Sequence, residues 1–402
     1  MRVALLSRGA HPLHDPGGME RAVYLLAKHL QARGVETVLV TRPPTRGGHF
    51  PGRVVTVEYG DNGRGHGRIL SRSLHYPAFS RRVGARAAAM VLAGEVDLVD
   101  AQGLTALGYG RLRRRDPRLR APLVMNPQGL EEHKARGLKR LALARLRALS
   151  REAARLADRV VATDAATRDE VPRHLGVDPS RVVVLPNGVD LDEIAAATPP
   201  EAREAAEAAV PTLREADLVF LSVGRLEGYK GFADAGAALL SLHDSGRLGP
   251  RWAWVLAGEG PAASSLRRSL SPALRPHVHL VGRVDERLLH ALYERADVFV
   301  HPTRYEGSSL VTLEAMAHGR PVVATRAGGI PDKVIDGTTG RLVDPGDVAG
   351  LAAALGEVCA DRPGREAMGA AGRCRVRSEF SSSALVERTL ALYETLLREA
   401  RP

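Results

Sequence analysis

The chain has 402 residues, enough for two or three domains that each bury a core, and its 44% apolar content is that of a globular protein. No stretch approaches the roughly 20 apolar residues of a membrane span, and two cysteines, Cys359 and Cys374, exclude a disulfide framework and favour a reducing cytoplasm. The net charge of +11 lies in residues 1–200, where 32 Lys and Arg stand against 20 Asp and Glu; with 4% aromatic residues and no recognisable module, nucleic acid is not an expected partner.

Short apolar runs alternate with helix-length segments, which is typical of parallel α/β layers. The first half predicts strands at Val3–Ser7, Thr37–Thr41, Val54–Val57, Leu98–Ala101, Leu123–Asn126, Arg159–Thr163 and Val182–Leu185. The second half predicts strands at Leu218–Val223, Trp252–Ala257, Val278–Val281, Val298–Val300 and Val322–Thr325. We expect two doubly wound Rossmann-like domains facing each other across a cleft, with ligands at the strand ends.

The expected boundaries are an N-terminal domain at 1–190, a second domain at 191–375 and a tail at 376–402. Pro186–Asp190 resembles a structural turn at the domain junction, and Ala195–Asp217 looks like a linker with a short surface helix. An amphipathic helix is predicted at Phe380–Leu397.

Basic residues concentrate in the run Arg111–Arg115 and in one predicted helix, Gly137–Asp158. Helical spacing places four arginines on one face and four leucines on the other: Arg140, Arg147, Arg151 and Arg155 against Leu138, Leu141, Leu149 and Leu156. This pattern favours an anionic membrane surface or an acidic acceptor, and a merely solvated helix face accounts for it equally well.

Two carboxylates follow the strand Val298–Val300. Glu306 lies in a Gly/Ser turn, and Glu314 lies eight residues later in a predicted helix that starts near Ser308. The free N–H groups at the start of that helix predict an anion site, typically for phosphate. Glu314 is then placed for a ribose and Glu306 for a sugar, although two solvated glutamates would give the same spacing.

The stretch resembles the Glu-x7-Glu signature of retaining glycosyltransferases of family 4, which use nucleotide-sugar donors on the two-domain GT-B fold. Its flanks agree as well: Pro302, Glu314–Ala317, Gly319, Pro321–Val323 and Gly328-Gly329. The resemblance is strong over about residues 215–345 and weaker over 1–190. In such a fold, the tail helix returns to the N-terminal domain.

Two cations lie on one loop after the strand Leu218–Val223. Arg225 and Lys230 are suited to neutralising a leaving diphosphate, the work that a divalent metal does in other transferases. This segment resembles the family motif in which Gly-Arg-Leu is followed, after several residues, by Lys-Gly, and the resemblance implies the same role. We therefore expect no metal and no cofactor beyond the donor substrate, with Arg225, Lys230 and Glu306 as the catalytic set.

Several turns are expected to contact the donor. From the resemblance, these are the N-terminal Gly17 and Gly18, the strand-end glycines Gly224, Gly258 and Gly282 with Arg283, and the residues Gly307, Ser308, Ser309 and Leu310 with Glu314. A solvated arginine is an equal alternative for Arg283.

The first half departs from the family pattern in two segments. Asp100-Ala101-Gln102 stands where family members often carry His-x-His, and Gln128 stands where they often carry a histidine before a glycine; glutamine can bind a hydroxyl but does not carry a proton as imidazole does. Gln128 is therefore expected to bind the acceptor without a catalytic role, and His133 is expected to be a surface residue.

The expected activity is transfer of a sugar, with retention, from a nucleoside-diphosphate sugar to a glycan or lipid-linked acceptor in cell-envelope or extracellular glycan synthesis. The expected location is cytoplasmic, peripheral on the inner face of the plasma membrane. A nucleotide-sugar 2-epimerase, a transferase acting on a soluble small molecule and a non-catalytic binding protein are the alternatives. The absence of cleft histidines disfavours the epimerase.

Overall fold

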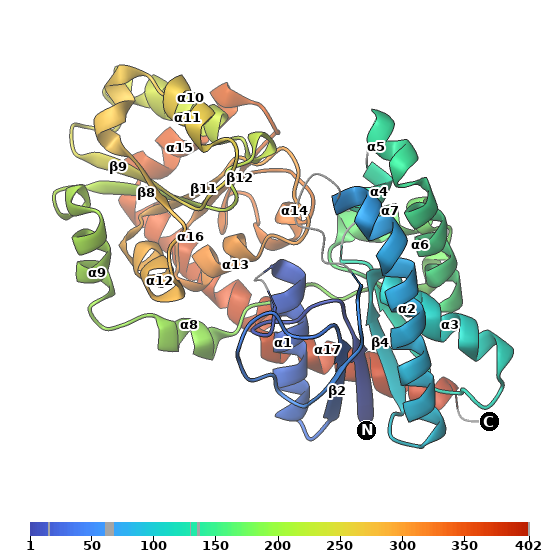
Figure 1. The fold of residues 1–402 in the computed structure, drawn as a ribbon. Helices are drawn as coiled ribbons and strands as arrows, with labels where there is room; N and C mark the ends of the chain where they lie inside the picture. Colours follow the sequence, from blue (N-terminus) through green and yellow to red (C-terminus); the bar gives the residue numbers. More distant parts are fainter. Residues whose placement is uncertain (15–16, 61–67, 129, 135–136, 401–402) are drawn as a thin grey trace. The chain divides into compact units, whose positions relative to one another are not determined.

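The computed structural model describes residues 1–14, 17–60, 68–128, 130–134 and 137–400. These residues form two compact units: unit 1 is Met1–Asn187 with Ser382–Pro402, and unit 2 is Gly188–Ser381 (Figure 1). The chain passes between the units within the turn that the sequence places at the junction, close to the expected boundary at 190.

Unit 1 contains a seven-stranded parallel sheet with the order β3-β2-β1-β4-β5-β6-β7. Its strands are β1 Arg2–Leu6, β2 Glu36–Thr41, β3 Arg53–Thr56, β4 Leu98–Gln102, β5 Leu123–Asn126, β6 Arg159–Ala162 and β7 Val182–Val184. Its helices are α1 Gly18–Gln31, α2 Arg68–Leu92, α3 Ala106–Arg115, α4 Glu131–Lys134, α5 Gly137–Ala142, α6 Ala144–Leu156, α7 Ala165–Leu175 and α17 Ser382–Glu399, with 3-10 turns η1 Gly103–Thr105 and η2 Pro179–Arg181.

Alternate residues of the strands pack on opposite faces of this sheet, so each face carries its own apolar cluster. Val3 and Leu5 belong to the cluster that also contains Val386, Tyr393 and Leu396 of α17. The opposite cluster contains residues of α2, α3 and α6. The C-terminal helix is thus part of the core of unit 1.

The prediction of one helix over Gly137–Asp158 is wrong. The helix breaks at Leu143, which turns with φ −95° and ψ 2° and is buried together with Leu146. Leu141, expected on the apolar face, is 73% exposed. Periodicity alone did not reveal the break.

Unit 2 contains a six-stranded parallel sheet with the order β10-β9-β8-β11-β12-β13. Its strands are β8 Leu218–Val223, β9 Trp252–Ala257, β10 Val278–Gly282, β11 Val298–His301, β12 Val322–Thr325 and β13 Gly340–Val343. Its helices are α8 Leu191–Ala197, α9 Ala202–Ala209, α10 Phe232–Asp244, α11 Ala263–Ser269, α12 Glu286–Arg295, α13 Leu310–Ala317, α14 Ile330–Lys333, α15 Val348–Ala360 and α16 Arg362–Arg375, with 3-10 turns η3 Pro211–Arg214, η4 Gly228–Lys230 and η5 Pro272–His277 and a π-turn η6 Val376–Phe380.

All the predicted strands are present, and the strand orders confirm the expected class of two doubly wound α/β domains. β13 was not predicted, because its apolar run is only Leu342 and Val343. The segment taken for a linker is instead part of unit 2: Ala206 of α9 is fully buried in its core. No helix in the described ranges is long and apolar enough to cross a membrane.

Candidate functional site

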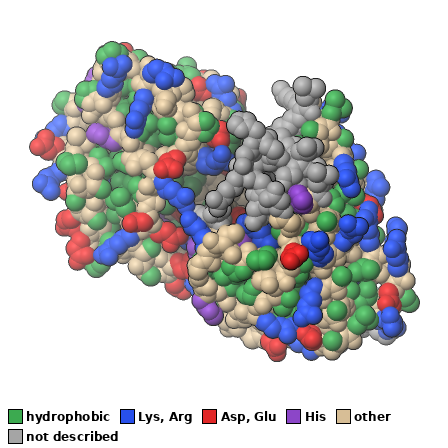
Figure 2. All heavy atoms as spheres, in the orientation of Figure 1, with side chains coloured by type: hydrophobic (Ala, Val, Ile, Leu, Met, Phe, Trp, Pro, Cys, Tyr) green, Lys and Arg blue, Asp and Glu red, His purple; other side chains and the backbone are tan. Residues whose placement is uncertain are grey.

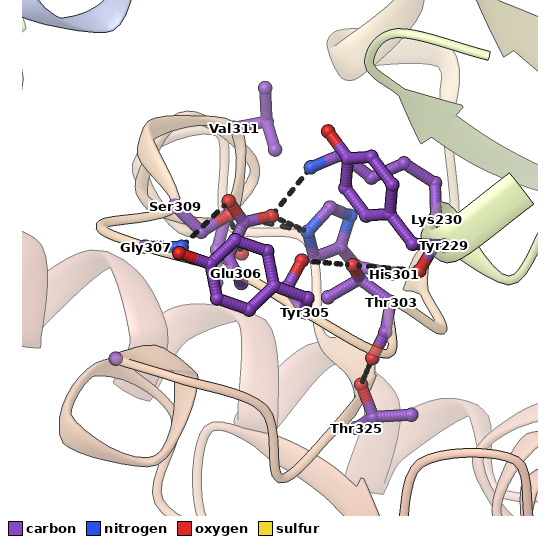
Figure 3. A network of polar contacts seen from close by, with 12 residues as sticks. Tyr229, Lys230, His301, Thr303, Tyr305, Glu306, Gly307, Ser309, Val311 and Thr325 are labelled. Carbon is purple, nitrogen blue, oxygen red and sulfur yellow. Dashed lines mark hydrogen bonds and ion pairs between the residues drawn. The ribbon is translucent and has the colours of Figure 1, made fainter. Parts of the chain in front are cut away.

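The loop after β11 carries the central cluster of unit 2. β8 and β11 are neighbours at the point where the strand order reverses, which is where open α/β sheets bind ligands beyond their carboxyl ends. One carboxylate oxygen of Glu306, Oε2, lies 2.7 Å from Lys230 Nζ and 2.7 Å from His301 Nε2 (Figure 3). The other, Oε1, accepts a hydrogen bond from the amide of Gly307 at 3.2 Å.

These three side chains are buried: Lys230 is 12% exposed, Glu306 14% and His301 0%. Burial acts to raise the pKa of Glu306, but His301 and Lys230 outweigh it and hold that pKa at about 2. Burial lowers the pKa of His301 despite its carboxylate neighbour. A neutral His301 donates from Nε2 to Glu306, and its buried Nδ1 has no hydrogen-bond partner within the described residues.

Hydrogen bonds to the turn η4 and to β12 hold the loop. The amide of Arg304 donates to the carbonyl of Tyr229 at 2.7 Å, and the hydroxyl of Thr325 donates to the carbonyl of Thr303. Gly231 and Gly328 both have positive φ, and a Cβ on either would lie 1.9 Å from a loop carbonyl oxygen, that of Pro302 or of Glu306 respectively. The loop is therefore clamped by close backbone approach on two sides.

The helix α13 begins one turn after Glu306, with Ser309 as its N-cap. The Ser309 hydroxyl is buried and lies 2.8 Å from the hydroxyl of Thr312. The hydroxyl of Ser308 is buried and has no hydrogen-bond partner in the described part of the chain. An unsatisfied buried hydroxyl next to free helix N–H groups is consistent with a site built for an anionic ligand.

Glu314 lies in the middle of α13 and does not contact Glu306. Its Oε2 accepts a hydrogen bond from Tyr293 of α12 at 3.1 Å. The Tyr293 ring stacks on His318 with centroids 5.3 Å apart, and His318 Nδ1 lies 2.7 Å from Glu294. A supported tyrosine thus fixes the position of this carboxylate.

Arg225 is placed apart from the buried cluster. Its side chain is 75% exposed and forms an ion pair with Glu227 at 2.7 Å, whereas Lys230 pairs with Glu306. The two cations expected to act together share one loop but hold different carboxylates.

Three of the predicted glycines converge at the carboxyl edge of the second sheet. The Gly224 amide donates to the carbonyl of Ala257 at 3.0 Å, and the Gly258 amide donates to the carbonyl of Gly282 at 2.7 Å. A Cβ on Gly258 would lie 1.9 Å from the Gly224 carbonyl oxygen, so this approach requires glycine. Arg283, in the turn that follows, is exposed.

The predicted residues of unit 1 lie at the strand ends of the first sheet. Gly17 and Gly18 are exposed at the start of α1, with Gly17 as the N-cap. Gln128 follows β5 and has φ +59°, the only positive φ of a non-glycine residue in the described ranges. His133, expected at the surface, is partly buried, with a pKa lowered to about 4 by burial and by neighbouring His174.

Sequence reasoning assigned no role to His301 or Tyr293, and it used Gly231 and Gly328 only as parts of motifs. His301 had one signal, its position at the end of a strand five residues before Glu306. Tyr293 had none, because its role depends on the packing of α12 against α13.

Comparison with known proteins agrees with this geometry. Residues 16–193 match the family model described as Glycosyltransferase Family 4, and residues 217–361 match that described as Glycosyl transferases group 1. The chain is 31% identical to D-inositol 3-phosphate glycosyltransferase of Streptomyces scabiei over an alignment of 431 positions, which covers 100% of this chain and 92% of that protein.

Over a shorter region of 251 residues, the chain is 36% identical to glycogen synthase of Mycobacterium tuberculosis (strain CDC 1551 / Oshkosh). This region is 61% of the chain and 56% of the synthase, so little more than half of that relative is matched. Among solved structures, Anabaena Alr3699/HepE in complex with UDP has a TM-score of 0.75 at 19% identity, covering 98% of this chain and 100% of that one, which shows a shared fold.

Three findings agree with one another: the full-length match above 30% identity, the two family models, and the position of the site where the strand order of the second sheet reverses. The chain belongs to glycosyltransferase family 4.

Proposed function

We propose that this protein transfers a sugar from a nucleoside-diphosphate sugar, bound by unit 2, to an acceptor bound by unit 1, with retention of the anomeric configuration. The observation that carries the proposal is the buried Lys230–Glu306–His301 cluster at the carboxyl ends of β8 and β11. Lys230 and Glu306 keep their charges in a buried site. Charged groups held in this way are suited to recognising a polar, anionic substrate.

In this proposal, Lys230 and Arg225 bind the diphosphate. Lys230 already lies against Glu306, and Arg225 exchanges its exposed partner Glu227 for phosphate oxygens. The amides of Ser308, Ser309 and Leu310 and the unpartnered Ser308 hydroxyl supply further donors. These groups stabilise the charge that builds on the leaving diphosphate, and no metal ion or cofactor is required.

The two glutamates have separate roles. Glu306, acceptor-only because its pKa is about 2, receives hydrogen bonds from hydroxyls of the donor sugar. Glu314, held by Tyr293, binds the ribose hydroxyls. The strand-end glycines and Arg283 surround the nucleotide, and Gly17 and Gly18 contribute N–H groups from unit 1. The departing diphosphate accepts the proton of the attacking hydroxyl, so no side chain serves as general base.

The acceptor is proposed to be a lipid-linked or cell-envelope glycan, with the enzyme peripheral on the cytoplasmic face of the membrane. The support is the basic first half: Figure 2 shows Lys and Arg side chains dispersed over the visible face of unit 1. Part of this charge is engaged within the protein, since Arg111 pairs with Glu152 at 2.6 Å and Arg151 donates to the carbonyl of His174 at 2.8 Å. The full-length relative, by its name, acts on a phosphorylated inositol, which is a soluble anionic acceptor.

Incubation with UDP-, ADP- and GDP-sugars, without added acceptor, tests the activity. We expect slow hydrolysis of one donor to free nucleoside diphosphate, with the anomer released in the donor configuration. Interconversion of two nucleotide sugars would identify an epimerase instead, and binding without any turnover would contradict catalysis.

Liposome co-sedimentation tests the membrane proposal. Four arginines near an anionic bilayer contribute about 1 kcal/mol each at low salt. Reversal of Arg140, Arg147, Arg151 and Arg155 to Glu should abolish sedimentation and leave donor hydrolysis intact. The matched control reverses four exposed arginines of unit 2: Arg267, Arg268, Arg275 and Arg287. A parent protein that stays in the supernatant at low salt contradicts the proposal and favours a soluble acceptor.

A further inference from the structure

A chain of polar side chains crosses the interior of unit 1 and ends at Gln128. Tyr393 of α17 donates its hydroxyl hydrogen to Asp100 Oδ2 at 2.6 Å, and Gln102 donates from Nε2 to Asp100 Oδ1 at 2.9 Å. Gln128 then donates from Nε2 to Gln102 Oε1 at 2.8 Å. We refer to Tyr393, Asp100, Gln102 and Gln128 as the amide relay. Tyr393 and Asp100 are 0% and 4% exposed, and Gln102 is 3% exposed.

The chemistry of Asp100 fixes the direction of every hydrogen bond in the relay. An ionised carboxylate only accepts, so Gln102 must turn its NH2 group toward Asp100. The Gln102 carbonyl oxygen then faces Gln128, and Gln128 must turn its own NH2 group toward Gln102. The Gln128 carbonyl oxygen is left at the end of the relay, where it accepts no hydrogen bond from the described part of the chain.

The backbone of Gln128 provides a second, independent observation. Its φ of +59° is unfavourable for a residue with a Cβ, and such strain is retained where the surroundings impose it, commonly at binding sites. Its amide donates to Asn126 Oδ1 at 2.9 Å, so the side chain at the end of β5 fixes this conformation. Gln102 and Asn126 are the last residues of two paired strands, β4 and β5, at the carboxyl edge of the sheet.

We propose that the amide relay fixes the carbonyl oxygen of Gln128 as a hydrogen-bond acceptor that selects a hydroxyl group of the substrate held by unit 1, with Asp100 and Gln102 as positioning residues. A free glutamine side chain can turn its amide either way, whereas in the relay Gln102 holds one N–H of Gln128 and so fixes the side on which the Gln128 carbonyl oxygen is presented. The relay therefore favours a neutral sugar or polyol hydroxyl over a carboxylate or phosphate at this position. The ligand class rests on the proposed function; the orientation of the amides does not.

The composition of the chain makes a direct test possible, because Gln31, Gln102 and Gln128 are its only glutamines. Protein labelled with [15N]glutamine gives three side-chain NH2 signals in an NMR spectrum, each assigned by one Gln→Leu substitution. Gln31, which donates to Thr37 Oγ1 at 3.2 Å outside the relay, is an internal reference.

Asp100→Asn reverses the relay. We expect Tyr393 to keep donating to the oxygen of the substituted amide, which then presents its NH2 group to Gln102, so that both relay glutamines turn over. We expect the Gln102 and Gln128 signals to move while the Gln31 signal stays in place. Tyr393→Phe is the matched control: it removes a hydroxyl from the same buried contact but leaves Asp100 as an acceptor, so neither signal should move substantially. The relay is overturned if only the Gln102 signal moves in Asp100→Asn, or if the Gln102 and Gln128 signals move equally far in Tyr393→Phe.

Titration with glucose, mannose, galactose and myo-inositol, each compared with inorganic phosphate, tests the ligand class. In the parent, at least one polyol should move the Gln128 signal, phosphate should not, and Asp100→Asn should weaken the polyol response by roughly 2- to 10-fold, the range for one neutral hydrogen bond. A response to phosphate alone, or to none of these probes, overturns selection of a hydroxyl. Donor hydrolysis, measured in parallel, reports separately on the proposed transferase function.

Discussion

The two sheets each place a buried carboxylate near their carboxyl edge, and the two carboxylates behave in opposite ways. Glu306 in unit 2 lies against Lys230 and His301, and its pKa is held at about 2. Asp100 in unit 1 receives hydrogen bonds from two neutral groups, Tyr393 and Gln102; burial outweighs them and raises its pKa to about 6. Burial acts to raise the pKa of both carboxylates, and their partners decide whether that effect is overcome: the charged surroundings of Glu306 overcome it, and the neutral donors at Asp100 do not.

We propose that the difference also separates two kinds of recognition. The charged groups of unit 2 suit a diphosphate and its sugar, and the oriented amides of unit 1 suit hydroxyl groups. Substitutions at the two edges should therefore affect different properties of the protein.

Removal of a cation from the charged edge should have the largest effect. Lys230→Ala or Arg225→Ala should lower donor turnover by about two to three orders of magnitude, the scale for loss of one preorganised charge-stabilising group. Steady-state donor hydrolysis measures this, and Lys28→Ala, in the last turn of α1, is a control for loss of a lysine elsewhere. EDTA should not affect the parent enzyme. Activity that EDTA abolishes and a divalent metal restores would refute the metal-free proposal.

The two carboxylates should give opposite pH dependences of stability. The ordinary pKa of Glu306 is 4.5 and its folded value is about 2, so it contributes about 3 kcal/mol that is present above pH 4.5 and lost as the pH falls toward 2. Asp100 has an ordinary pKa of 3.8 and a folded value of about 6, so its stabilisation is present below pH 3.8 and about 3 kcal/mol is lost as the pH rises through 6.

Urea unfolding as a function of pH measures this contrast. Relative to the parent, Glu306→Gln should flatten the pH dependence between 2 and 4.5, and Asp100→Asn should flatten it between 4 and 7. Tyr393 and Gln102, the groups that contact Asp100, do not titrate in that second range. Identical profiles for Asp100→Asn and the parent between pH 4 and 7 would show that Asp100 is not perturbed.

The two glutamates of unit 2 should separate nucleotide binding from sugar transfer. Glu314→Gln should weaken nucleoside-diphosphate binding by roughly 10- to 100-fold, the range for hydrogen bonds to a charged group, because the ribose contact does not need the sugar. Glu306→Gln should lower transfer and leave that affinity nearly unchanged. Calorimetry with UDP, ADP and GDP tests this, and an equal loss of affinity in both variants contradicts the division of roles.

The smallest effect is expected at Tyr293, which is proposed to act on the ligand through Glu314. Tyr293→Phe keeps the ring stacked on His318 and removes the hydroxyl that donates to Glu314 at 3.1 Å and to the carbonyl of Val311 at 3.2 Å, so nucleoside-diphosphate affinity should fall by roughly 2- to 10-fold. The same change combined with Glu314→Gln should cost little more than Glu314→Gln alone. Full additivity in this double-mutant cycle would show that Tyr293 does not act through Glu314.

The sequence by itself determined the two parallel sheets, since each buried strand is an apolar run between turn residues. It also placed Lys230 and Glu306 on loops that follow strands of the second sheet, and Glu314 in the helix after Glu306. Only the tertiary structure decided their contacts. Arg225 forms an ion pair with Glu227, whereas Lys230 forms one with Glu306. His301 contacts Glu306 because the clamped loop folds back toward the end of β11.

The same limit explains the error in the helix predicted over 137–158 and the residues that were overlooked. Helical periodicity follows a regular helix and does not reveal the break at Leu143. The relay begins with a hydrogen bond between Tyr393 and Asp100, which are 293 positions apart in the chain. A hydrogen bond over such a separation leaves no local pattern in a sequence, because the packing of α17 against the sheet brings the partners together.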